Sequence, residues 1–176
     1  MVAKEIQKII AIDPGYDRCG VAIVSEASGK PTILFSTCIT SDKADEQHLR
    51  LTSIFKQLEK IIKKHKPSHL AIETLFFSVN KKTAIRVAEA RGTILTLAGL
   101  RHLDLVELSP QAIKLAMTGV GNATKEQIQK MVKLTVVLPK TTRLDDEIDA
   151  IALGIASLQK IRFENRGKVL AKQNRF

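Results

Sequence analysis

Four acidic residues lie at positions that could form a site for chemistry. Two of them end apolar runs, where their charge must be balanced, and two are close neighbours in the sequence. Asp13 ends the first apolar run of the chain and Glu73 ends a later, shorter one. A charge at the end of a buried strand is costly unless something balances it. Asp146 and Asp149 are three residues apart, so on a helix they share one face. Because the four can converge on one spot, we interpret them as candidate metal ligands and catalytic residues.

Carboxylate oxygens of this kind are the ligands that Mg²⁺ or Mn²⁺ prefers. Two such cations held roughly 4 Å apart can hydrolyse a phosphodiester, because one activates a water and the other stabilises the leaving oxygen. Asp13 would bridge the two ions if its strand lies centrally, with Glu73 and Asp146 or Asp149 on either side. The residues therefore indicate a site for two Mg²⁺ ions, with Mn²⁺ as an alternative.

Each acid also has a purely structural interpretation. Asp13 precedes Pro14-Gly15, and Asp before such a turn commonly caps it through its own side chain. Acids at the start of a helix near Asp145 commonly complement the helix dipole. The combination of strand-end and helix-face carboxylates, rather than any one of them, favours the metal site.

The net charge points to a polyanionic partner. The chain has 28 Lys and Arg against 18 Asp and Glu, a formal charge of +10. The last seventeen residues hold six basic residues and one acid, which is either a solvated end or a contact for nucleic acid. Few of these residues are apolar, so nucleic acid is favoured over a membrane surface.

Length and leader signals complete the outline. We expect one domain over residues 1–163 and a basic C-terminal tail over 164–176. The N-terminal residues lack the apolar core of a signal peptide, and no apolar run approaches a membrane span, so we expect a cytoplasmic protein without membrane contact. Two cysteines are too few for a disulfide framework.

The hydrophobic pattern predicts an α/β domain with a mixed five-stranded sheet flanked by helices. Strands are predicted near 9–13, 20–24, 32–40, 70–73 and 105–108, and helices over 47–66, 83–102, 110–117, from 124 and over 145–163. Ser41 or Asp42 is expected to cap the first helix. Ala88, Gly92 and Gly99 share a helix face that would pack closely against its own sheet or against a second subunit.

An ordered set of motifs resembles one known family. The motifs are Ile12-Asp13-Pro14-Gly15 with Arg18 and Gly20, Ala71-Ile72-Glu73 with Phe76, Ala90-Arg91-Gly92, Gly119 to Gln127, and Asp146 with Asp149-Ala150. Together they closely resemble the RuvC family of bacterial Holliday-junction resolvases, of the RNase H-like superfamily. The resemblance runs in order from the first strand to about residue 160.

The resemblance implies an RNase H-like fold and a homodimeric, metal-dependent endonuclease that resolves four-way DNA junctions by paired cuts in opposed strands. It implies a role in recombination and repair beside the branch-migration proteins RuvA and RuvB. The family's carboxylates fall on the four acids named above. Its junction-contacting Phe falls on Phe76, and its basic residues near the phosphates fall on Lys114 and Lys125.

The residues themselves support part of this DNA contact. Phe76 lies near Lys81 and Lys82, and an aromatic ring with nearby cations can stack on an unpaired base while the cations neutralise phosphate. Packing in the core is the alternative for Phe76. Lys125 falls in the first turn of its helix, where a cation opposes the dipole, which is a reason to expect a phosphate contact.

Three other functions are alternatives for these residues. An RNase H-like nuclease acting on RNA or ordinary duplex would share the carboxylates. An actin-like or sugar-kinase ATP-binding protein has a similar Asp-x-Gly strand but duplicates the unit, and 176 residues hold only one. A module that binds branched DNA without cutting would gain nothing from four clustered acids, because they repel DNA.

Overall fold

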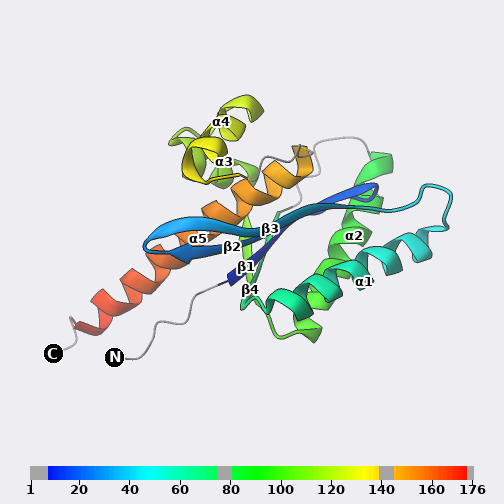
Figure 1. Ribbon diagram of the computed structural model, residues 1–176, viewed down its shortest axis with the longest axis horizontal. Helices are drawn as coiled ribbons and strands as arrows, with labels where there is room; N and C mark the ends of the chain where they lie inside the picture. The colour runs from blue at the N-terminus through cyan, green and yellow to red at the C-terminus, as the bar shows by residue number, and fades with distance from the viewer. Residues whose placement is uncertain (1–7, 75–80, 139–144, 174–176) are drawn as a thin grey trace.

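The fold is seen in a computed structural model that describes residues 8–74, 81–138 and 145–173, with side chains from 84 in the second segment and to 167 in the third. Its centre is one five-stranded sheet in the order β3-β2-β1-β4-β5 (Figure 1). The strands are β1 (Lys8–Asp13), β2 (Arg18–Ala27), β3 (Lys30–Thr40), β4 (His69–Glu73) and β5 (Asp104–Leu108).

The sheet is mixed, as predicted. β1 pairs antiparallel with β2 through the tight connection after Asp13, and β2 pairs antiparallel with β3. β4 and β5 continue the sheet in parallel on the other side of β1, because a helix connects each to the strand before it. β1 is therefore central, which is the condition for a bridging position of Asp13.

Both faces of the sheet are buried, because its inner strands are apolar on both sides. One face packs on α1 (Gln47–His65) and α2 (Lys81–Leu100), with Ile10 and Ile12 of β1 in that core. The other face packs on α5 (Asp145–Gln173), with Ile9 and Ala11 of β1 in the second core. The helices α3 (Pro110–Thr118) and α4 (Lys125–Thr135) lie on α5, away from the first two helices (Figure 1).

The first helix begins differently from the prediction. Glu46 occupies the N-cap position of α1 without a side-chain cap, so the expectation for Ser41 or Asp42 is wrong. Ser41 instead donates to the carbonyl of Tyr16 at 2.8 Å, and Asp42 accepts from the backbone of Ala44 in a local turn. Both side chains are used before the helix starts.

The last helix is longer than predicted. α5 continues through the expected end near 163 to Gln173, and it leads away from the sheet (Figure 1). Residues 164–173 contain no proline and are mostly good helix formers, so nothing in them stops the helix. The division into a domain over 1–163 and a tail over 164–176 stays a prediction.

Candidate active site

The two strand-end carboxylates lie side by side at the carboxyl edge of the sheet. β1 and β4 are parallel neighbours, and Ile12 pairs with Ile72, so the residues that follow, Asp13 and Glu73, are adjacent. Arg91 of α2 holds the end of β4, since it donates to the carbonyl of Glu73 at 3.3 Å and pairs with Glu107 of β5. Arg91 belongs to one of the family motifs, Ala90-Arg91-Gly92, but its role was not predicted.

The start of α5 is pressed against the same edge. Asp13 pairs in register with Gly20 of β2, and a Cβ atom on Gly20 would lie 1.9 Å from the carbonyl oxygen of Asp146. Two turns further on, a Cβ atom on Gly154 would lie 2.4 Å from a methyl group of Val24. These two glycines let α5 lie close on the sheet, which brings its acidic first turns next to Asp13.

Three of the four predicted carboxylates share a cavity of about 250 Å³. Asp13, Glu73 and Asp149 line it together with Lys114 and Lys125. The remaining lining is largely apolar and comes from Pro110, Ile113, Ile128 and Ala152. This cavity is where chemistry at the carboxylates would take place.

Helix caps fix the two lysines. Ser109 caps α3 by accepting from the backbone of Ala112, with Pro110 in the first turn. A capping box between Thr124 and Gln127 opens α4, which begins where the sequence predicted. Lys114 and Lys125 are thereby carried on two short helices whose ends are well defined, and both face the acids.

Lys125 contacts two of the acids at the start of α5. Its Nζ lies 2.9 Å from Asp149 Oδ2 and 3.6 Å from Asp145 Oδ2. The hydrogen bond to Asp149 raises the pKa of Lys125, so its charge is held firmly. The contacts with Asp149 and Asp145 explain why a lysine stands in the first turn of α4, where a cation opposes the helix dipole.

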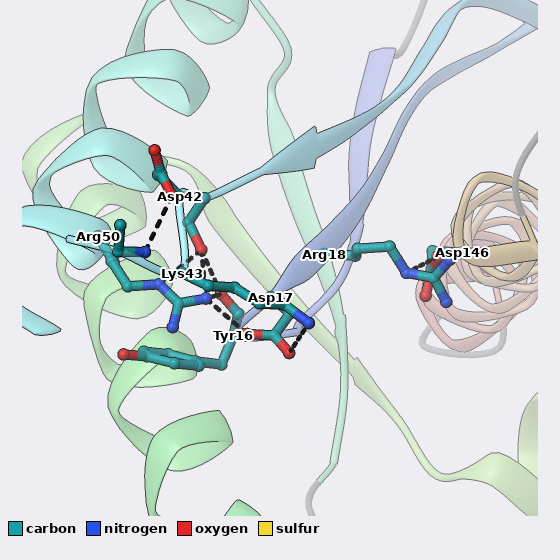
Figure 2. Close-up of polar contacts among 9 residues, drawn as sticks. Tyr16, Asp17, Arg18, Asp42, Lys43, Arg50 and Asp146 are labelled. Atoms are coloured by element: carbon teal, nitrogen blue, oxygen red, sulfur yellow. Dashed lines mark hydrogen bonds and ion pairs between the residues drawn. The ribbon is translucent and has the colours of Figure 1, made fainter.

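Asp146 differs from the other three acids, because it is not among the residues that line the cavity. Its Oδ2 pairs with Arg18 Nε of β2 at 3.1 Å, as Figure 2 shows, and Cys38 Sγ lies 4.0 Å from the same oxygen. Arg18 belonged to a quoted motif, but its role was missed. A register argument could have found it, since it lies two residues before Gly20 on the strand beneath α5.

The electrostatics show an excess of negative charge at the strand ends. Burial, followed by the charges of Asp149, Glu73 and Asp146, raises the pKa of Asp13 to about 7. Burial and Asp149 also raise the pKa of Glu73. Burial raises the pKa of Asp149 although Lys125 opposes the shift. Asp13 and Glu73 are thus the acids with the least compensation.

The donor set fits hard divalent cations by its chemistry. Its oxygen atoms come from carboxylates, and they are crowded enough to hold a proton on Asp13 near neutral pH. Within residues 8–74, 81–138 and 145–173, no three His, Cys, Asp or Glu side chains are already arranged around a common metal position. In this conformation Lys125 and Arg18 neutralise Asp149 and Asp146.

A buried arginine network supports the connection between Asp13 and Arg18. Arg50 of α1 donates to Asp17 Oδ1 at 2.5 Å and to Ser41 Oγ at 2.8 Å, and its guanidinium stacks 3.7 Å from the centre of the Tyr16 ring (Figure 2). This role of Arg50 was missed, although Arg50 lies four residues before Ile54 and so continues the buried stripe of α1, a spacing that could have indicated it.

The remaining predicted DNA contacts are only partly visible. Phe76 lies outside the described residues. Lys81 and Lys82 begin α2, but the structure describes only their backbone. Their predicted roles stay predictions.

No described helix is long and apolar enough to span a membrane. The mixed five-stranded sheet covered by helices on both faces is an RNase H-like fold, and its central strands β1 and β4 end in carboxylates. Residues 9–157 match the family described as crossover junction endodeoxyribonuclease RuvC. The chain therefore belongs to the RuvC family.

Relatives and solved structures agree with this assignment. The RuvC of Thermosipho melanesiensis is 40% identical, covering 89% of this chain and 99% of the relative, and that of Brachyspira hyodysenteriae is 40% identical, covering 89% and 96%. Thermus thermophilus RuvC in complex with a Holliday junction superimposes with a TM-score of 0.83 at 23% identity, covering 90% of this chain and 96% of that one. The yeast mitochondrial resolvase Ydc2 gives 0.68 at 14% identity, covering 96% and 86%, and so shares the fold.

Proposed function

We propose that this RuvC-family endonuclease resolves four-way DNA junctions by metal-dependent hydrolysis at Asp13, Glu73, Asp146 and Asp149. The observation that carries the proposal is the cavity in which Asp13, Glu73 and Asp149 face Lys114 and Lys125. Acids alone would repel DNA, whereas lysines at the rim attract a phosphate to the acids. The net charge of +10 favours the same substrate.

The chain's own residues would divide the work as follows. Asp13, central and half-buried, would face both of two Mg²⁺ or Mn²⁺ ions, with Glu73 and Asp149 on either side and Asp146 at the edge. Bound cations of this kind supply activation of a water and stabilisation of the leaving oxygen. Lys114 and Lys125 would hold the phosphate and the developing charge.

Phe76, Lys81 and Lys82 complete the proposed DNA contact, with the ring stacking on an unpaired base. β4 ends at Glu73 and α2 begins at Lys81, so Lys81 and Lys82 lie shortly after the site in the sequence. This part of the proposal rests on the sequence.

A homodimer is part of the proposal, because two cuts in opposed strands need two sites. The small-residue face of α2 supports it: Gly92 and Gly99 are exposed, and a Cβ atom on either would meet nothing within 4 Å. Packing on the chain's own sheet therefore does not explain these glycines. Ile85 and Leu100, also exposed on α2, add apolar surface.

The proposal also includes RuvA and RuvB as partners, which the family resemblance implies. Action in the cytoplasm is proposed from the sequence.

A nicking assay tests the function. A synthetic four-way junction, a linear duplex and an RNA·DNA hybrid are each incubated with Mg²⁺ or with EDTA. Metal-dependent paired cuts in the junction alone are expected. Cutting of the duplex or hybrid instead would keep the fold and favour the alternative nuclease.

A matched pair of variants tests the site. Asp13→Asn should abolish cleavage while junction binding is kept or tightened, because one negative charge is removed from the cavity. Asp104→Asn is the control, since Asp104 begins β5 at the opposite edge of the sheet and is exposed. Unchanged cleavage by Asp13→Asn would overturn the assignment.

A further inference from the structure

The ion pair between Arg18 and Asp146 lies next to the cavity but not in it. The Arg18 Nε to Asp146 Oδ2 distance is 3.1 Å, and the side chains are 52% and 21% exposed. Among the described residues, Lys125 pairs with Asp149 and Asp145. The three aspartates at the start of α5 are thus paired with two cations: Asp145 and Asp149 with Lys125, and Asp146 with Arg18.

The position of Arg18 is fixed by the turn before it. Successive residues of a strand point to opposite faces. Asp17 points toward α1, where Arg50 holds it, while Arg18 points toward α5 and Asp146 (Figure 2). By holding Asp17, Arg50 fixes the orientation of the backbone at Arg18. The Arg18 side chain therefore extends toward Asp146.

We propose that Arg18 is a positioning residue that holds Asp146 beside the cavity in the metal-free protein and competes with a divalent cation for its carboxylate. The inference rests on the proposed function, in which Asp146 is a metal ligand. A charge-assisted bond orients the carboxylate well. At a half-exposed site such a bond is also weak enough for a divalent cation to displace it.

The proposed competition predicts the direction in which the affinity for a divalent cation changes when Arg18 is replaced. Loss of Arg18 frees Asp146 for the cation, so the metal should bind more tightly. A purely structural role predicts the opposite, because a displaced Asp146 would loosen metal binding along with the fold. An exposed ion pair contributes at most about 1 kcal/mol, which corresponds to about fivefold in affinity.

The test is calorimetric titration of Mn²⁺ into the full chain without DNA. Arg18→Gln should bind Mn²⁺ about fivefold more tightly than the parent, and Arg18→Lys should return most of the way to it. Arg162→Gln is the matched control, because Arg162 is a half-exposed arginine paired with Glu26, four turns further along α5. Its Mn²⁺ affinity should not change. Unchanged or weaker binding by Arg18→Gln would overturn the inference.

Asp146→Asn separates this inference from the proposed function. The variant should bind Mn²⁺ more weakly, and adding Arg18→Gln to it should bring no tightening, since the two residues act through one contact. If Asp146→Asn binds Mn²⁺ as the parent does, the proposed role of Asp146 as a ligand fails. If Asp146→Asn weakens binding but Arg18→Gln does not tighten it, only the role of Arg18 fails.

Discussion

Gly20 and Asp146 meet backbone to backbone, at the point where α5 crosses β2 beside Asp13. A Cβ atom on Gly20 would lie 1.9 Å from the carbonyl oxygen of Asp146 and 3.2 Å from its Cβ. No side chain can be accommodated there unless the helix moves. The absence of a side chain at residue 20 therefore determines how closely the acids of α5 approach the ends of β1 and β4.

Gly20→Ala should destabilise the protein and abolish cleavage. The clash is with backbone, which yields less readily than a side chain, so a cost of at least about 1–3 kcal/mol in the free energy of unfolding is expected. Urea unfolding and the junction assay measure both effects. Gly167→Ala, in α5, where a Cβ atom would meet nothing within 4 Å, should instead stabilise by about 1 kcal/mol. A Gly20→Ala protein of parental stability would contradict this account.

The sequence was sufficient for the architecture because its signals are local. The apolar run ending at Asp13 and the helices predicted over 110–117 and from 124 each depend on a few neighbours in the chain, and the structure confirms all three. The central position of β1 was only a condition for a bridging Asp13, and it is known from the strand order of the structure. The motifs of the RuvC family predicted the fold class, which the comparison confirms.

The partners of the acids could not be predicted, because they depend on side chains far apart in the sequence. Arg18 and Asp146 are separated by most of the chain. Arg50 lies on the buried stripe of α1, but its partners Tyr16 and Asp17 belong to a turn more than thirty residues earlier in the sequence. The length of α5 was missed for another reason. Its last turns have no stop signal, and the hydrophobic pattern on which the prediction rested ends earlier.

The raised pKa of Asp13 predicts a pH-dependent stability in the metal-free protein. Its pKa is about 7 in the folded chain and near 3.9 when unfolded, so between these values the folded state holds a proton that the unfolded state lacks. Stability from this group is present at low pH and is lost as pH rises toward 7. In EDTA the unfolding free energy should therefore fall by a few kcal/mol at most, roughly 1.4 per pKa unit, between pH 4.5 and 7.5.

Asp13→Asn should flatten that dependence, because an amide does not titrate. The measurement is urea unfolding in EDTA across this pH range for both proteins. The Asp104→Asn control, at the exposed start of β5, should follow the parent. If Asp13→Asn loses as much stability as the parent over the range, another group accounts for the effect.

Gly92→Gln should weaken the proposed dimer without harming the fold. The open space around residue 92 in one chain accepts the side chain, and glutamine is a better helix former than glycine. At the proposed interface the same side chain would separate two closely packed helices. Sedimentation should show a dimer for the parent and a monomer for the variant, with cuts no longer paired. Gly167→Gln, equally open, serves as control, and a dimeric Gly92→Gln would contradict the interface.

Lys125→Met should lower both junction affinity and cleavage. The lysine ammonium balances Asp149 and lines the cavity, so its loss removes a phosphate contact and leaves the acids more repulsive. The slope of log K against log salt should fall by about 0.9, the value for one phosphate contact. Lys130→Met, exposed on the same helix and absent from the cavity lining, should change the slope less. Equal slopes for Lys125→Met and the parent would argue against a phosphate contact.

Arg50→Leu should reduce cleavage by loosening the turn between Asp13 and Arg18. The guanidinium donates to the carbonyl of Tyr16, to Asp17 and to Ser41, and its removal breaks these bonds, including a charge-assisted one to Asp17, at a cost of about 1–3 kcal/mol. Arg50→Lys keeps the charge but not the planar fork, so an intermediate loss is expected. Arg101→Leu, which breaks a partly buried pair with Glu59 between α1 and the end of α2, is the control. If Arg50→Leu is destabilised as much as Arg101→Leu but cleaves normally per folded molecule, the network serves the fold alone.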